Sequence, residues 1–218
     1  MATKIERIAP EQVLTIMHPW RTLEDRAPSP CGDKKWRAFL KTLDEDGVLG
    51  FYSKSACGVQ RYLSNFQEIP RPLAFLGQRF RTVEHAFQAA KWLYAEKGPR
   101  NDMFETLAVG GAWGDLPATK IKSKGGARAF AVMEEKLDLD RWNAQSVAVM
   151  KAILKARAAV DPLLRSILVR ARVDNVSLYH FAPSRRRKEP FWGVQSIKKS
   201  NPKYLWGKNV LGKLLMLL

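Results

Sequence analysis

Apolar residues recur at helical spacing in one stretch of the chain, which reads Thr-Val-Glu-His-Ala-Phe-Gln-Ala-Ala-Lys-Trp over residues 82–92. Thr82 is a suitable N-cap, because its hydroxyl can accept a hydrogen bond from a free backbone N–H in the first turn. The pattern predicts a helix that begins after Thr82 and turns one apolar side toward a core. The residues on that side are Val83, Phe87, Ala90 and Tyr94.

A polar row accompanies the apolar side of this helix. Glu84, Gln88 and Lys91 are spaced at i, i+4 and i+7, so they share a second side next to the first. A carboxylate, an amide and an amine aligned beside a buried surface can form the wall of a pocket. Alternatively, Glu84 interacts favourably with the helix dipole and the row is a solvated face.

The other apolar patterns predict mainly helices with a few strands. Strands are expected at 48–53 and 176–181, with a hairpin at 73–81 around Gly77. Further helices are expected at 101–109, 141–159, after the N-cap pair Asp161-Pro162, and within 207–216, and a basic helix or turn is expected at 117–124. We therefore expect an α+β protein that is mostly α, built as a compact single domain with a few short strands.

The first part of the chain differs from the rest. Residues 1–47 are broken by several prolines and contain one short helical pattern around Trp36 and Leu43. We expect an N-terminal extension docked on a main domain that spans residues 48–218.

The composition narrows the class of protein. It is 46% hydrophobic and 27% charged, and no apolar run reaches the roughly 18 residues that span a bilayer. The N-terminus has no signal-peptide pattern, so we expect a cytoplasmic protein with no membrane partner. Two isolated cysteines and three histidines without ligand spacing predict no disulfide framework, no metal site and no cofactor.

Charge is unevenly distributed along the chain. The formal net charge is +16, yet residues 1–50 hold eight basic and eight acidic residues. From Arg185 to the end there are nine basic residues and one acidic residue. Such a balance favours an anionic partner, most often nucleic acid, although it can also reflect background composition.

Several segments, in the same order, resemble one family. They match the NADAR family, also described as the YbiA-like or riboflavin-biosynthesis-intermediate N-glycosidase-like family, over roughly 51–218. The matching segments are Phe51-Tyr-Ser, Tyr62-Leu-Ser-Asn-Phe66, 82–91, Ala118-Thr-Lys120, Trp142 with Val149-Met150, Phe191-Trp-Gly193 and Gly207-Lys-Asn-Val-Leu-Gly212.

The resemblance implies a mainly helical domain that hydrolyses N-glycosidic bonds. In that family the substrates are early riboflavin intermediates or ADP-ribose attached to the amino group of guanine. The residues that the resemblance assigns to catalysis are Glu84, Lys91 and Glu189. Other residues are candidates for substrate binding, either from the resemblance or from their position in the chain: Asn65, Gln88, Lys120, Trp142, Trp192, Gly193 and Asn209.

Two departures from the family pattern concern the same region. Glu189 stands where the family usually has Asp, which keeps the charge but adds a methylene to the reach. The preceding strand reads Tyr179-His180-Phe181 where the family tends to have an acid. Between them lies a basic loop that we expect to contact a nucleic-acid backbone: Arg185, Arg186, Arg187 and Lys188.

These residue types suit cleavage of a ribosyl C–N bond. The transition state resembles an oxocarbenium ion, so the site needs an anion near the anomeric carbon, a water or nucleophile, and help for the leaving nitrogen. Glu84 can supply the anion or orient the water. Lys91 can hold a phosphate or protonate the leaving nitrogen as an ammonium, or form a Schiff base as an amine.

The other candidates each have a structural alternative. Trp142 and Trp192 can stack on a base or belong to the core. Asn65 can bind the ribose or hold a turn, and Asn209 can be a helix cap. His85 points about 100° away from Glu84 on a helix and is expected to be structural.

The net positive charge of the chain favours one of the substrates that the resemblance implies. ADP-ribosylated nucleic acid is polyanionic, whereas a riboflavin precursor carries few charges. We therefore expect removal of ADP-ribose from guanine in DNA or another nucleic acid. The partner would be that nucleic acid or another ADP-ribose-containing ligand. The alternatives are hydrolysis of early riboflavin intermediates and a non-catalytic nucleic-acid-binding module.

Overall fold

A computed structural model describes residues 48–55, 58–182, 189–196 and 205–218. The expected N-terminal extension, residues 1–47, and the basic loop at 185–188 lie outside the described residues. The helices are α2 (Gly58–Tyr62), α3 (Val83–Trp92), α4 (Asn101–Thr106), α5 (Ala118–Lys124), α6 (Ala127–Val132), α7 (Leu139–Val160), α8 (Pro162–Val173) and α9 (Val210–Met216). The strands are β1 (Val48–Phe51), β2 (Leu73–Phe75), β3 (Gln78–Phe80), β4 (Ser177–His180), β5 (Gln195–Ser196) and β6 (Leu205–Trp206).

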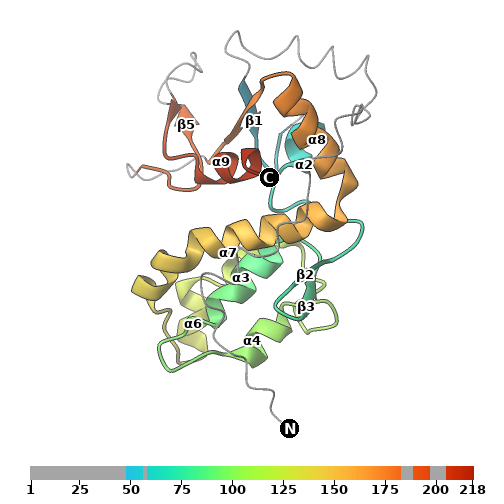
Figure 1. The fold of residues 1–218 in the computed structure, drawn as a ribbon. Coiled ribbons are helices and arrows are strands. Elements are labelled where there is room, and N and C mark those ends of the chain that lie inside the picture. The colour runs from blue at the N-terminus through green and yellow to red at the C-terminus, as the bar shows by residue number, and fades with distance from the viewer. Residues whose placement is uncertain (1–47, 56–57, 183–188, 197–204) are drawn as a thin grey trace.

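The long helix α7 lies across the middle of the molecule. In Figure 1, α3, α4, β2 and β3 lie on one side of it, and α8, α9 and β1 on the other. Its inward residues Ile153 and Leu154 are fully buried, which the apolar pattern at 141–159 predicted. Helices dominate and the strands are short, so the predicted class, mostly helical α+β, is confirmed.

The described strands form two-stranded sheets. β1 pairs in parallel with β4, with Phe51 opposite His180, and so joins two segments that are far apart in the chain. β2 and β3 form the predicted hairpin, whose turn residues Leu76 and Gly77 both have positive φ. Two residues with positive φ are typical of the tight turn that matches the twist of a hairpin.

Some elements were not predicted. α2, α6, β5 and β6 are too short for their apolar residues to define a period. α6 is fixed by tertiary contact, because Phe130 stacks on Trp92 of α3 with ring centroids 3.9 Å apart.

The junction between α7 and α8 carries a buried ion pair. Asp161 caps α8 as predicted, since its side chain accepts from the Leu164 N–H. Its carboxylate also accepts from Arg157 Nε at 3.1 Å, and neither side chain has any exposed surface. The Arg157 guanidinium donates further to the carbonyls of Tyr62 and Ser64. We call Arg157 and Asp161 the junction pair; it fixes the segment that precedes Asn65.

No helix among the described residues is long and apolar enough to cross a membrane.

Candidate active site

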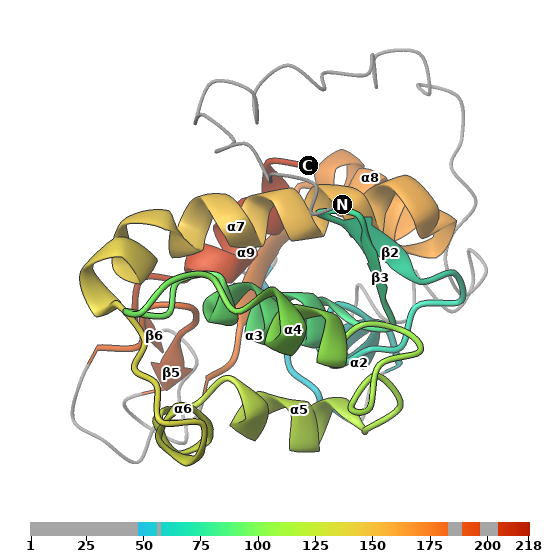
Figure 2. The same ribbon diagram turned by 90° about the horizontal axis from the view of Figure 1, so that it is seen from below.

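Helix α3 is buried on almost all sides. Figure 2 shows it between α7 and α5, and it contacts both. The relative exposure of Glu84 is 6% and that of Gln88 is 4%. The alternative of a solvated polar row is therefore wrong, because two members of the row lie inside the protein.

The polar row is a continuous chain of hydrogen bonds. Gln88 Nε2 donates to Glu84 Oε1 at 2.8 Å, and Lys91 Nζ donates to Gln88 Oε1 at 2.7 Å. The Gln88 amide thus links the carboxylate to the ammonium. Within the described chain, Gln88 is the one hydrogen-bond donor to that carboxylate, so Oε2 remains for a water or a ligand. We call these three residues the α3 row.

Burial perturbs both charged members of the α3 row. Desolvation raises the pKa of Glu84, while the Gln88 hydrogen bond and the charges of Lys122 and Lys91 oppose this rise. Desolvation lowers the pKa of Lys91, an effect that Glu84 opposes and Lys122 reinforces. Perturbed ionisable groups at close quarters are typical of functional sites.

Helix α5 closes one side of the row. Lys91 Nζ also donates to the Gly125 carbonyl at 3.3 Å, and Trp92 Nε1 donates to the Lys124 carbonyl at 3.1 Å. A Cβ at Gly125 would lie 2.3 Å from Gln88 Oε1. The glycine therefore permits this close approach of α5 to α3.

Aromatic rings form another side of the site. Phe87 contacts both predicted stacking residues, with ring-centroid distances of 5.1 Å to Trp142 and 5.4 Å to Trp192. Lys91 Nζ lies 5.6 Å from the Phe87 ring and 5.9 Å from the Trp142 ring. Trp142 is buried and Trp192 is half-buried, so Trp192 retains surface for a ligand. Their stacking on a base stays a prediction.

Asn65 is attached to the start of α3. Its carbonyl accepts from the Glu84 N–H at 3.0 Å, which places the predicted asparagine beside the predicted carboxylate. Its side-chain Oδ1 is buried and has no hydrogen-bond partner, while Nδ2 faces the Met150 sulfur at 3.9 Å. An unsatisfied buried acceptor is costly in a folded protein unless a water or ligand satisfies it.

Trp192 is held by backbone contacts between β4 and α9. Its carbonyl accepts from His180 Nδ1 at 3.3 Å and from the Leu211 N–H at 3.1 Å. A Cβ at Gly193 would lie 2.4 Å from the His180 carbonyl, so glycine lets this loop approach β4. Burial lowers the pKa of His180, which favours a neutral ring.

Asn209 does not act as the side-chain helix cap that the sequence suggested. It occupies the N-cap position of α9, but its backbone is left-handed with φ of 50° and its side chain makes no cap hydrogen bond. Its amide instead accepts from the His180 N–H and donates to the Leu178 carbonyl. Its role in substrate binding stays a prediction, although both amide atoms are already bonded to β4.

His85 has the structural role that was predicted. Its Nε2 bonds to the Leu116 carbonyl and its Nδ1 to the Thr82 hydroxyl. The same hydroxyl accepts from the His85 N–H, which confirms Thr82 as the N-cap.

Two predicted site residues have no described contact with the α3 row. Lys120 and Glu189 are exposed, and no contact joins either to the α3 row among the described residues. Lys122 is different, because its charge acts on Glu84, Lys91 and His180. Lys122 was not predicted as a site residue, since a lysine in a basic helix carries no signal of which side it faces.

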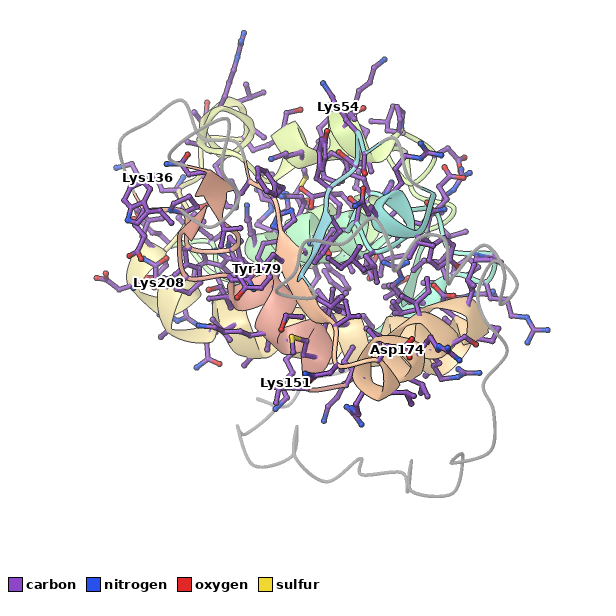
Figure 3. All side chains as sticks on the ribbon, turned by 90° about the horizontal axis from the view of Figure 1, so that it is seen from above. Lys54, Lys136, Lys151, Asp174, Tyr179 and Lys208 are labelled. Carbon is purple, nitrogen blue, oxygen red and sulfur yellow. The ribbon has the colours of Figure 1, made fainter. Side chains whose placement is uncertain are left out.

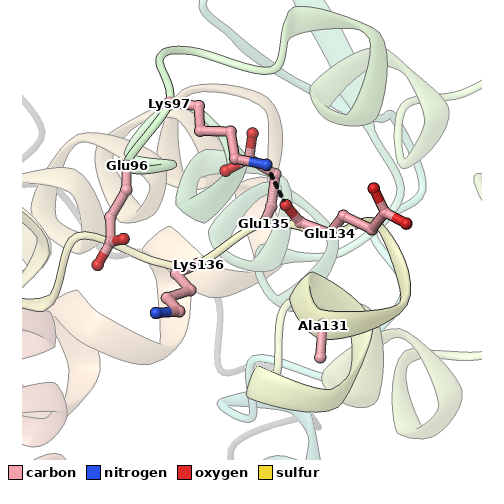
Figure 4. A pocket seen from close by; sticks show the side chains of 6 residues that line it. All are labelled: Glu96, Lys97, Ala131, Glu134, Glu135 and Lys136. Atoms are coloured by element: carbon pink, nitrogen blue, oxygen red, sulfur yellow. Dashed lines mark hydrogen bonds between the residues drawn. The ribbon is translucent and has the colours of Figure 1, made fainter.

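A surface cavity lies elsewhere, between the chain after α3 and the end of α6 (Figure 4). Its volume is about 420 Å³. The Lys97 ammonium donates to the Glu134 carbonyl, and Glu135 Oε2 is buried without a partner. The cavity contains no member of the α3 row and no aromatic ring. Its lining consists of Glu96, Lys97, Ala131, Glu134, Glu135 and Lys136.

Three labelled lysines lie on different parts of the surface. Lys54, Lys136 and Lys151 project outward at separate parts of the outline in Figure 3.

No group of three or more histidine, cysteine, aspartate or glutamate residues able to hold a metal ion occurs in the described part of the chain.

Comparison with known proteins bears on the fold of this chain. No family model matches this sequence, and no curated protein does so either. Among solved structures, the NMR structure of the Escherichia coli protein YbiA matches with 24% sequence identity and a TM-score of 0.53. The match covers 80% of this chain and 84% of that chain. The chain therefore has a YbiA-like fold, as the ordered motifs led us to expect.

Proposed function

We propose that this protein is an N-glycosidase of the NADAR type that removes ADP-ribose from guanine bases of nucleic acid. The observation that carries the proposal is the α3 row, a buried carboxylate linked through an amide to a lysine, on a YbiA-like fold. The ordered sequence motifs add to the fold, because they include every member of this row.

Glu84 is the central group of the proposed reaction. The C1′–N bond breaks, a C1′–O bond forms to water, and a proton passes to the leaving nitrogen. Positive charge develops at C1′, and an ionised carboxylate in a desolvated site stabilises it strongly. Glu84 would provide this charge and orient the water through Oε2.

Lys91 has two possible roles in this scheme. As an ammonium it would hold a phosphate oxygen or give a proton to the leaving nitrogen. As an amine it would displace the base from C1′ of the opened sugar and form an imine, which water then hydrolyses. Borohydride reduction distinguishes the two, because it traps the imine as a stable adduct on wild type and not on Lys91→Gln.

The choice of nucleic acid rests on charge. The net charge of +16 suits a polyanionic substrate, and a modified base that is single-stranded or flipped could reach a site flanked by Trp142 and Trp192. Arg185–Lys188 would contribute backbone contacts.

Release of ADP-ribose from a guanine-ADP-ribosylated single-stranded oligonucleotide tests the proposal. Wild type should release it, and Glu84→Gln should be slower by about 10³-fold because the charge at C1′ is no longer stabilised. Glu96→Gln is the matched control, since it removes an exposed carboxylate that lines the cavity of Figure 4.

The remaining outcomes discriminate among the alternatives. Equal loss in both variants would point away from the α3 row. Tight binding without release would favour a non-catalytic nucleic-acid-binding module. If wild type shows no binding and no release, the proposal is contradicted, and the next substrates to assay are early riboflavin intermediates.

A further inference from the structure

Helix α5 carries a further cation, Lys122, which makes no hydrogen bond to the α3 row in the described structure. Ala118 and Ile121 are buried, and hydrogen bonds to Gly125 and Lys124 carbonyls fix the end of the helix against α3. Lys122 follows Ile121 and is exposed, so its ammonium is free to meet a ligand.

The position of the Lys122 ammonium is defined by its neighbours. It lies 5.8 Å from the centroid of the Phe66 ring, and Phe66 directly follows Asn65. Its charge also lowers the pKa values of Glu84, Lys91 and His180, which belong to two separate elements, α3 and β4. Because the Asn65 carbonyl accepts from the Glu84 N–H, the contact with Phe66 places the Lys122 ammonium near the first turn of α3.

Lys122 has no ion-pair partner among the described residues, because no carboxylate of these residues lies within ion-pair distance of its ammonium. The site therefore holds two ammonium groups, Lys91 and Lys122, and one carboxylate, Glu84, whose burial opposes ionisation. An anionic ligand would relieve this excess of positive charge.

We propose that Lys122 is a specificity-determining residue that binds a phosphate group of the substrate beside the Glu84 and Lys91 side chains. The inference rests on the proposed function, in which the substrate carries the pyrophosphate of ADP-ribose. Lys122 attracts a phosphate oxygen and leaves the anomeric carbon to Glu84. A lysine suits this task, because its compact ammonium binds phosphate without the fixed geometry of a guanidinium.

Calorimetric titration with free ADP-ribose tests this role without requiring turnover. Lys122→Gln should weaken binding by about tenfold or more, as expected for loss of a charge-assisted hydrogen bond. Lys122→Arg should restore most of the affinity, because it restores the charge. Lys136→Gln is the matched control, since it removes an exposed lysine at the cavity of Figure 4.

A second readout is the pH profile of turnover. The Lys122 charge lowers the pKa values of both Glu84 and Lys91. In Lys122→Gln both values should rise, so each limb of the profile that Glu84 or Lys91 sets should move to higher pH, whichever role Lys91 has. A purely structural defect would lower the rate without moving the limbs.

Failure of this inference differs from failure of the proposed function. Weaker ADP-ribose binding in Lys122→Gln without any glycosidase activity of wild type would support the lysine and contradict the function. Turnover of the oligonucleotide by wild type, with unchanged ADP-ribose binding in Lys122→Gln, would support the function and contradict the role of Lys122. Equal weakening in Lys136→Gln, or no binding of ADP-ribose by wild type, would overturn the assignment of Lys122.

Discussion

The protein buries two polar clusters that look alike in composition and differ in how completely they are satisfied. The junction pair joins α7 to α8 with full hydrogen bonding. Tyr62 donates to Asp161 Oδ1 at 2.7 Å, and Arg157 donates from Nε, Nη1 and Nη2. The α3 row instead leaves Glu84 with one donor among the described residues, next to an unsatisfied Asn65 Oδ1.

The difference separates a structural network from a candidate functional one. A buried network whose groups are all paired adds order to the fold, whereas a partly satisfied one costs stability and is retained where a ligand completes it. The pKa of Tyr62, raised to about 12 mainly by burial and then by Asp161, keeps its hydroxyl protonated as the donor in the first cluster. In the second cluster, desolvation raises the pKa of Glu84 and lowers the pKa of Lys91.

The largest effect is expected on stability, when the junction pair is broken. Arg157→Ala leaves Asp161 as a buried charge without its partner, which should lower the free energy of unfolding by about 3–5 kcal/mol. Urea denaturation measures it. Arg170→Ala is the matched control, because Arg170 and Asp174 form the same i, i+4 pair with side-chain exposures of 28% and 20%. That control should lose less than about 1 kcal/mol.

Equal losses for these two variants would remove the structural role assigned to the junction pair. The folded fraction of Arg157→Ala should also keep the pH profile of wild type, since no group of the α3 row contacts the junction pair among the described residues.

The second prediction concerns the pH dependence of turnover. The proposed reaction uses ionised Glu84, so the rate should fall as pH decreases through its pKa, which lies above the ordinary 4.5. If Lys91 acts as an ammonium, the rate should also fall as pH rises through its pKa, which lies below the ordinary 10.5. Beyond each limb the expected change is about tenfold per pH unit, or roughly 1.4 kcal/mol.

The profile of kcat/KM for wild type and Lys91→Gln distinguishes the two roles of the lysine. Loss of the basic limb in the variant would agree with an ammonium. A wild-type rate that rises with pH in this range would contradict it and favour the amine nucleophile.

The contrast between the two clusters also explains what the sequence could predict. Thr82 and the apolar side of α3 define a helix locally, and Asp161-Pro162 defines the start of α8 in the same way. The Glu84, Gln88 and Lys91 row follows from helical spacing alone. These features depend on neighbours within two turns, which a single sequence contains.

Other features depend on packing between distant segments. Arg157 looked like any basic residue of a long helix, yet it bonds carbonyls more than ninety positions away in the chain. Lys122 is distinguished from Lys120 only by which side of α5 contacts α3. Asn209 has the position of a helix cap, but the approach of α9 to β4 diverts its amide. Spacing along one element does not contain this information.

The smallest expected effect is a gain of stability in a variant that has lost activity. Burial raises the pKa of Glu84 in the folded state, so the stability that its protonated form contributes is present at low pH and lost as pH rises through that pKa. At neutral pH the ionised group therefore opposes folding. Gln at this position is uncharged and can still accept from Gln88, so Glu84→Gln should be more stable by about 1 kcal/mol, or roughly 2–4 °C in Tm.

Thermal unfolding at pH 7 and at pH 4 measures this gain, which should shrink at the lower pH because wild-type Glu84 is then protonated. Glu96→Gln, at an exposed carboxylate, should change stability by less than about 0.5 kcal/mol at either pH. A loss of stability in Glu84→Gln would mean that Lys91 needs the Glu84 charge as Arg157 needs Asp161. The two clusters would then be of one kind, and the inference from incomplete satisfaction to function would fail.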